Sequence, residues 1–132
     1  MEQTYIMLKP DALERGLMGQ VLSRIENKGY KIVKAELKQL GEDLIKEHYA
    51  HIADKPFFPE LAAFMTRGPV LALVVEGDNV VEGMRTLMGP TNIKEAQPGT
   101  IRGDFATNMT ENVIHGSDST ETAQIEIKRF FG

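Results

Sequence analysis

The chain of 132 residues contains no cysteine and no tryptophan. Without cysteine it can form no disulfide bond, no thiolate metal site and no cysteine nucleophile. Long apolar runs are missing too: the longest, VLALVV at 70–75, is far too short to cross a bilayer. The first residues also lack the basic and then apolar pattern of a secretory signal peptide. We therefore expect a cytoplasmic protein that has no membrane partner.

A net positive charge is also absent. The 15 Lys and Arg residues against 19 Asp and Glu residues give a net charge of −4, which argues against nucleic-acid binding through a general positive field. The sequence has no Gly-x-x-x-x-Gly-Lys-Ser/Thr loop and no Gly-x-Gly-x-x-Gly loop. We therefore expect any phosphate to be held by a few placed cationic side chains and by helix N-termini.

Hydrophobic residues make up 42% of the chain, and 132 residues can bury a core as a single domain spanning 1–132. Their periodicity predicts that strands alternate with helices. Strands are expected at 4–9, 30–40, 68–77 and just before His115, and helices at 17–29, 42–52, 55–65, 79–87 and after 118. The core of this order is βαββαβ, which predicts an α+β, ferredoxin-like sandwich with a four-stranded, mainly antiparallel sheet.

A small doubly wound sheet fits the same order of elements. The second strand, 30–40, favours the ferredoxin-like arrangement, because its residues alternate between apolar and charged. We expect Val33, Ala35 and Leu37 to face the core while the charged residues between them face water, which is typical of an antiparallel sheet.

Capping residues suggest where the helices begin and end. Gly29 is expected to end one helix and Asn79 to cap the start of another. Asp118 is followed three residues later by Glu121, which resembles a capping box for the last helix. The segment 89–112 has no clean period, and long irregular segments in compact domains are usually functional.

His115 is the first candidate for chemistry, because it lies at a strand end and Gly116 would leave room for a ligand. Glu126 lies on or beside the apolar face of the last helix and would need a partner there. If that helix folds back over the sheet, Glu126 can hold one nitrogen of His115 and leave the other as a nucleophile or base. The alternatives are a histidine bonded to a carbonyl and a glutamate in water.

The other two histidines, His48 and His51, lie three residues apart on a predicted helix. A metal site would need a third ligand, for which Asp54 is the nearby candidate, and an apolar surround. We expect two surface histidines instead.

Four blocks carry a resemblance to a known family: MLKPDALERGLMG at 7–19, HYAHIADKPFFPEL at 48–61, PGTIRGDF at 98–105 and NVIHGSDS at 112–119. Over nearly its full length the chain resembles nucleoside diphosphate kinase. The resemblance implies a ping-pong transfer of the γ-phosphoryl group from a nucleoside triphosphate, usually ATP, to a histidine and then to a nucleoside diphosphate.

The resemblance also implies a set of site residues. His115 matches the phosphorylated histidine, Glu126 the glutamate that orients it, and Ser117 the serine that supports this glutamate. The remaining matches are Lys9 and Tyr49 near the transferred phosphate, Arg85, Thr91 and Arg102 at the phosphates, Asn112 at the sugar hydroxyls, and Phe57 as the aromatic on which the base stacks. Mg²⁺ is expected on the nucleotide phosphates, because the sequence shows no all-protein metal cage.

The resemblance also implies a homo-oligomer, with two features that depart from the family. Ile93 stands where relatives usually carry proline, and the chain ends at KRFFG, where relatives often continue. Hexamer, tetramer and dimer therefore remain open.

Two other functions fit the order of elements. One is a catalytically silent or regulatory nucleotide-binding module of the same fold, against which the complete set of matching residues argues. The other is an RNA-recognition domain, but IRGDF places Asp104 where that motif needs Gly-Phe.

Overall fold

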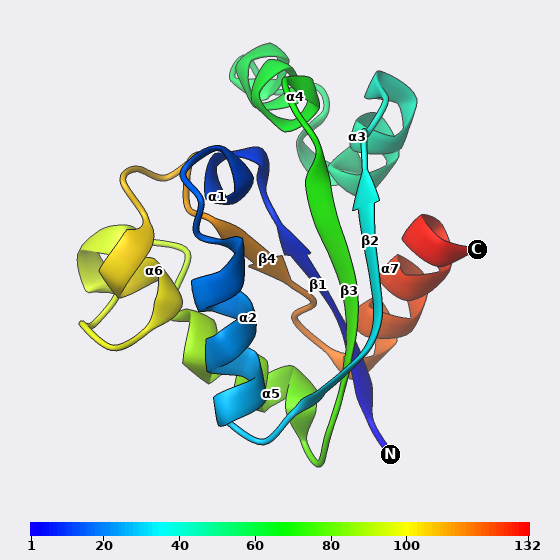
Figure 1. Ribbon diagram of the computed structural model, residues 1–132. Coiled ribbons are helices and arrows are strands. Elements are labelled where there is room, and N and C mark those ends of the chain that lie inside the picture. The colour runs from blue at the N-terminus through cyan, green and yellow to red at the C-terminus, as the bar shows by residue number, and fades with distance from the viewer.

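The computed structural model describes residues 1–132 and contains one sheet of four strands (Figure 1). The strands are β1 (Gln3–Leu8), β2 (Lys31–Lys38), β3 (Val70–Glu76) and β4 (Ile114–Gly116). Their order across the sheet is β2-β3-β1-β4, and every neighbouring pair is antiparallel. The prediction of a ferredoxin-like α+β sandwich is therefore confirmed, and the doubly wound alternative is wrong.

Helices cover both faces of this sheet (Figure 1). The α-helices are α1 (Pro10–Glu14), α2 (Met18–Asn27), α3 (Glu42–His48), α4 (Phe58–Thr66), α5 (Val80–Met88), α6 (Ile101–Phe105) and α7 (Thr120–Phe131). Two short 3₁₀ helices, η1 (Ala50–Ile52) and η2 (Ile93–Glu95), complete the set. None of the helices combines the length and the apolar composition that crossing a bilayer requires.

The alternation of side chains along β1 divides the core into two clusters. Ile6 and Leu8 pack with residues of α2 and α5 on one face. Tyr5 and Met7 pack on the other face with residues of α3, α4 and α7, where the ring of Tyr5 stacks on Phe130 at 4.6 Å. Because both faces of β1 are buried, the strand sits at the centre of the molecule, and its end is a rigid place for a functional residue.

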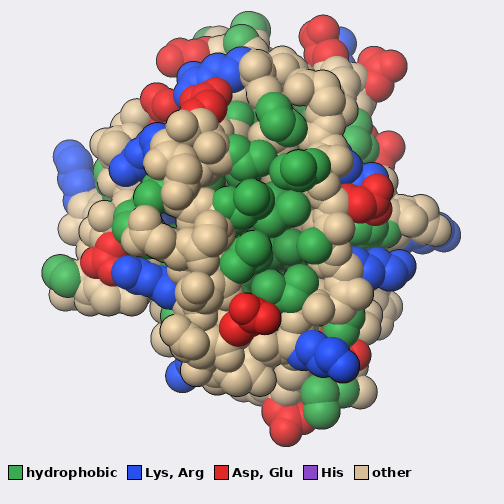
Figure 2. Space-filling model, viewed as in Figure 1, with side chains coloured by type: hydrophobic (Ala, Val, Ile, Leu, Met, Phe, Trp, Pro, Cys, Tyr) green, Lys and Arg blue, Asp and Glu red, His purple; other side chains and the backbone are tan.

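The edge strand β2 departs from its predicted burial. Ala35 and Leu37 pair with Leu73 and Leu71, so they do lie on the face that α2 and α5 cover elsewhere. They are nevertheless exposed, Leu37 by 61%, and Val33 is only half-buried. The helices do not extend over the edge of the sheet, and Figure 2 shows hydrophobic side chains gathered on this face between α2 and β2.

Two predicted caps are wrong in their chemistry, although both helices begin where expected. Asn79 precedes α5, but its side chain does not cap the helix; instead the carboxylate of Glu2 accepts the N–H of Val81 at 2.9 Å. The N-cap of α7 is Ser119, whose hydroxyl accepts the N–H of Thr122 at 3.1 Å. Asp118 is therefore free of a capping role.

Two segments contain more structure than the pattern predicted. The single helix expected over 42–52 is broken at Tyr49 into α3 and η1. The segment 89–112 holds α6, whose N-cap Thr100 accepts the N–H of Gly103 at 3.0 Å. A five-residue helix is too short to show a hydrophobic period, which explains why the pattern did not predict it.

Candidate active site

The register of β4 fixes the direction of His115. His115 pairs with Met7 in β1, so its ring lies on the same face as α7, whereas Gly116 points to the opposite face. A Cβ on Gly116 would meet Sδ of Met88 at 2.6 Å and Ile6 at 3.1 Å. The missing side chain of Gly116 thus makes room for the core, and Gly116 also lines the cavity described below.

A carboxylate from α7 meets the ring of His115. Nε2 of His115 lies 2.9 Å from Oε1 of Glu126, and the hydroxyl of Ser117 donates to the same oxygen at 2.6 Å. Since the carboxylate holds Nε2, the ring nitrogen left for a substrate is Nδ1. The side chain of His115 is 22% exposed and that of Glu126 only 7%, so the bracing group is buried and the braced ring reaches solvent.

The hydrogen bonds keep Glu126 ionised although it is buried. Burial raises the pKa of this carboxyl, but the hydrogen bond and charge of His115, with the bond from Ser117, outweigh burial and hold the pKa below its ordinary value. A charged Glu126 accepts the hydrogen on Nε2 of His115. The arrangement therefore sets the tautomer that leaves a lone pair on Nδ1.

Lys9 follows β1 directly and is bound to the residues that precede β4. Its ammonium donates to Oδ1 of Asn112 at 2.8 Å, and its backbone N–H donates to the carbonyl of Val113 at 2.8 Å. Val113 has φ of 75°, a left-handed conformation that a β-branched residue rarely adopts. The carboxylate of Asp11 accepts the N–H of Val113 at 3.2 Å, so α1 holds this strained residue and fixes Asn112 beside Lys9.

Lys9 is a buried cation that bonds to an amide oxygen and forms no ion pair with a carboxylate. Burial lowers its pKa to about 8, and the charge of Arg102 lowers it further against the opposing effect of Asp11. Burial in turn raises the pKa of Asp11. An anion near the ammonium of Lys9 would restore the charged form, so the site is electrostatically prepared for phosphate.

Arg102, on α6, ties the irregular segment to the sheet. Its Nη1 donates to the carbonyl of Gly89 at 2.9 Å and its Nη2 to the carbonyl of Ile114 at 2.7 Å. Burial, and then the charge of Arg85, lowers the pKa of Arg102 to about 10. A guanidinium has more N–H donors than these two carbonyls use, so Arg102 can support the cavity wall and also bind an anion.

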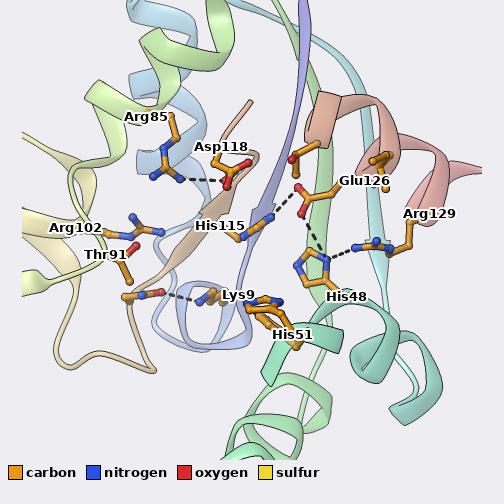
Figure 3. A pocket seen from close by; sticks show the side chains of 15 residues that line it. Lys9, His48, His51, Arg85, Thr91, Arg102, His115, Asp118, Glu126 and Arg129 are labelled. Carbon is orange, nitrogen blue, oxygen red and sulfur yellow. Dashed lines mark hydrogen bonds and ion pairs between the residues drawn. The ribbon is translucent and has the colours of Figure 1, made fainter. Parts of the chain in front are cut away.

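These side chains open onto one cavity of about 660 Å³ (Figure 3). The lining includes eight residues singled out from the sequence: Lys9, Tyr49, Arg85, Thr91, Arg102, Asn112, His115 and Glu126. Ser117 is buried behind Glu126, and Phe57 lies outside the lining with 53% of its surface exposed. Cations outnumber carboxylates on the wall, in a chain of net negative charge, so the cavity suits an anionic ligand.

The expectation for His48 is wrong, whereas His51 is exposed as expected. The side chain of His48 is 1% exposed, and its ring lies 4.7 Å from that of His115. Nη1 of Arg129 lies 3.0 Å from its Nδ1. The helical spacing of α3 indicated this burial, because Ile45, three residues earlier and on the same side of the helix, is fully buried.

Two further charged residues of the wall were missed. Asp118, interpreted as a helix cap, lines the cavity beside Arg85 (Figure 3). Arg129 lines it as well and was not singled out. Nothing in the local sequence distinguishes Arg129 from other basic residues near the end of a helix, which commonly face solvent.

The cluster of His48, His115 and Glu126 has its ligand atoms within 4.8 Å of one another, but it does not fit Mg²⁺. This cation prefers oxygen ligands, and two of the three groups are imidazoles. Ser117 and Arg129 already bond to members of the cluster. Asp118 is the exposed carboxylate on the wall, so it is the residue that fits a hydrated magnesium ion carried by a ligand.

The whole chain is similar to known proteins. The family model described as "Nucleoside diphosphate kinase" matches residues 2–132. A nucleoside diphosphate kinase from Macrococcus caseolyticus is 56% identical over 99% of this chain and 88% of its own length.

Solved structures agree with this match. A nucleoside diphosphate kinase from Encephalitozoon cuniculi superposes with a TM-score of 0.96 at 41% identity, covering 100% of this chain and 90% of that one. One from Halobacterium salinarum, in complex with CDP, superposes with a TM-score of 0.94 at 45% identity, covering 98% and 87%. The family model and these relatives match nearly the whole length of the chain, and the chain belongs to the nucleoside diphosphate kinase family.

Proposed function

We propose that Nδ1 of His115 attacks the γ-phosphorus of a nucleoside triphosphate, usually ATP. The bond from the γ-phosphorus to the β–γ bridging oxygen breaks, an N–P bond forms, and a nucleoside diphosphate leaves. In the second half-reaction a terminal oxygen of another nucleoside diphosphate attacks the phosphohistidine and restores the free ring. The observation that carries this proposal is the 2.9 Å contact between Nε2 of His115 and Glu126, which leaves Nδ1 as the free nitrogen.

The other charged residues of the cavity would position the phosphates and neutralise their charge, and would form no covalent bond to them. Phosphoryl transfer depends on in-line placement and on neutralising charge at the equatorial oxygens. Lys9, Arg85 and Arg102 supply cations on the cavity wall, and the hydroxyls of Tyr49 and Thr91 are placed there to donate to phosphate oxygens. The hydroxyl of Tyr49 is buried and has no partner within the protein, so a phosphate oxygen would satisfy it.

In this scheme Mg²⁺ would enter the cavity bound to the nucleotide. When bound with the nucleotide, it would offset the negative charge of the phosphates. Asp118 would hold such an ion through water, because it is the exposed carboxylate on the wall. His115 and Glu126 would remain bonded to each other during this binding.

The nucleoside would extend from the phosphates toward the mouth of the cavity. Asn112 would contact the sugar hydroxyls, and the exposed ring of Phe57 would stack on the base. Every base has a π-face, so stacking alone accepts all of them. This predicts a broad range of nucleoside substrates.

We also propose that the protein works as a homo-oligomer. Leu37 on the edge strand β2 is 61% exposed and Ala35 is exposed beside it, and an uncovered apolar edge tends to pair with another chain. Light scattering across protein concentration tests this, with Leu37→Lys as the variant. A wild-type protein that stays monomeric throughout would contradict the proposal.

The central proposal is tested with ATP labelled on the γ-phosphate and no acceptor present. Wild-type protein should retain an acid-labile, base-stable label, and added nucleoside diphosphate should remove it. His115→Ala should retain no label, whereas His51→Ala, which changes an exposed histidine on the same wall, should retain it. Label on His115→Ala would place the nucleophile elsewhere, and absence of label from wild type would favour a silent nucleotide-binding module.

A further inference from the structure

A second imidazole lies beside His115, and the reaction proposed above gives it no role. The ring centroids of His48 and His115 are 4.7 Å apart, with the rings edge to face at 81°. Nδ1 of His48 lies 3.7 Å from Oε2 of Glu126 and 3.0 Å from Nη1 of Arg129 (Figure 3). Its other nitrogen, Nε2, is buried and has no partner.

The contact with Arg129 determines which nitrogen of His48 carries hydrogen. A guanidinium has N–H donors and no acceptor, so Nδ1 of His48 must accept and the hydrogen must sit on Nε2. The other tautomer and the imidazolium would both place an N–H of His48 against an N–H of Arg129.

Arg129 is itself anchored. Its Nε donates to Oε2 of Glu47 at 3.0 Å. The side chain of Arg129 is 16% exposed and that of Glu47 is 62% exposed. Arg129 therefore connects a carboxylate at the surface to the buried ring of His48. Because Glu47 and His48 are neighbours on α3, one arginine of α7 fixes both the helix and the imidazole.

We propose that Arg129 is a positioning residue that keeps His48 neutral with its hydrogen on Nε2, and thereby reserves Glu126 for His115. A lone pair on Nδ1 of His48 has nothing to donate to the carboxylate 3.7 Å away. Without Arg129, Nδ1 can take up a proton and donate to Glu126. The carboxylate would then be shared by two imidazoles, and the orientation of His115 would be lost. This catalytic consequence rests on the proposed role of His115.

The surroundings of His48 support the direction of this effect. The charged and titratable groups that face its ring are Glu126 and Arg129 on α7, His115 on β4, Lys9 after β1, and the adjacent Tyr49. Burial, and then His115, lowers the pKa of His48 to about 3, and Arg129 and Lys9 add to this against the opposing effect of Glu126. Removing Arg129 therefore raises the pKa of His48.

The position of the hydrogen can be observed without any catalysis. The chain has three histidines, so ¹⁵N-histidine NMR spectra, assigned with His51→Gln and His115→Ala, resolve each ring. In wild type, Nδ1 of His48 should be unprotonated and Nε2 protonated, with no titration between pH 5 and 8. Arg129→Met should move the titration of His48 to higher pH, and Arg129→Lys should restore the wild-type spectrum in part. A hydrogen on Nδ1 in wild type, or an unchanged spectrum in Arg129→Met, would overturn the proposal.

The consequence for His115 is read from the rate of phosphoenzyme formation. Arg129→Met should lose more rate at pH 6 than at pH 8, because the protonated share of His48 grows as the pH falls toward its raised pKa. Lys128→Met, which removes a charge from an exposed position of the same helix, should show no such pH dependence. An equal loss at both pH values would overturn the catalytic part of the proposal. Failure of the proposed function itself would appear separately, as label on His115→Ala.

Discussion

The two walls of the cavity are built in different ways. On the wall formed by β4 and α7, side chains bond directly to side chains, as Ser117 and His115 do to Glu126 at 2.6 and 2.9 Å. On the wall formed by 89–112, the bonds are mostly to backbone, as those of Arg102 to the carbonyls of Gly89 and Ile114 are. The first wall sets the tautomer of the His115 ring, and the second holds a segment in place.

This difference predicts different consequences of mutation. Removing a carboxylate or hydroxyl from the β4–α7 wall should change the reaction more than the fold. Removing Arg102 from the other wall should change the fold as much as the reaction, since it leaves buried carbonyls without donors. Substitutions on the two walls should therefore differ in their effects on the reaction rate and on the free energy of unfolding.

Glu126→Ala should slow phosphoenzyme formation by about 100-fold, because the ring loses the group that sets its tautomer and orientation. Its free energy of unfolding should fall by about 1 kcal/mol, because the buried hydroxyl of Ser117 loses its acceptor. Rapid-quench kinetics and urea denaturation measure the two effects. Glu121→Ala, at an exposed position of the same helix, is the control, and a loss of less than about fivefold in Glu126→Ala would contradict the account.

Arg102→Met should lower the free energy of unfolding by about 2 kcal/mol, since two buried carbonyls lose their donor. Arg15→Met is the matched control: Arg15 donates to the carbonyl of Phe105 at 2.6 Å, but at an exposed position, so its loss should cost below about 0.5 kcal/mol. Urea unfolding curves give both values. Equal destabilisation by the two variants would show that Arg102 does not hold its wall.

Binding of ADP should weaken as the pH rises through about 8, the pKa to which burial lowers Lys9. Phosphate favours the charged form of Lys9, so this part of the affinity is present below pH 8 and is lost above it. Calorimetry should show Kd rising by roughly tenfold between pH 7 and 9. Lys9→Met should bind weakly at both pH values, and a wild-type Kd that does not change with pH would remove Lys9 from the phosphate site.

Ser117→Ala should have the smallest effect, slowing phosphoenzyme formation by about fivefold, because Glu126 keeps its bond to His115 but loses one donor. Ser119→Ala provides the comparison two residues away. It should leave the rate unchanged and lower the free energy of unfolding by about 1 kcal/mol, since Ser119 caps α7. A rate loss in Ser117→Ala as large as that in Glu126→Ala would contradict the order of importance assigned to these groups.

The sequence predicted the β4–α7 wall better than the 89–112 wall, and the reason is physical. Helical spacing placed Glu126 on or beside the apolar face of the last helix, where it would need a partner such as His115. The partners of Arg102 are backbone carbonyls 12 and 13 positions away. A carbonyl is present in every residue, so no pattern of side chains identifies it as a partner.

The same reasoning explains the error at His48. A histidine that follows the charged residues Lys46 and Glu47 at the end of a short helix is typical of a surface, and only Ile45, one turn earlier, indicated the buried side. The contact with Arg129 joins positions 81 residues apart. Contacts of this kind depend on how α3 and α7 pack, which local spacing does not determine.

The most decisive measurement identifies which nitrogen of His115 carries the phosphoryl group. Protein labelled with ¹⁵N on histidine, phosphorylated with ATP and kept at alkaline pH, gives a ³¹P–¹⁵N coupling that identifies the bonded atom. Because Glu126 holds Nε2 of His115, the account predicts a single phosphohistidine with phosphorus on Nδ1. Phosphorus on Nε2 of His115, or on any other residue, would contradict it.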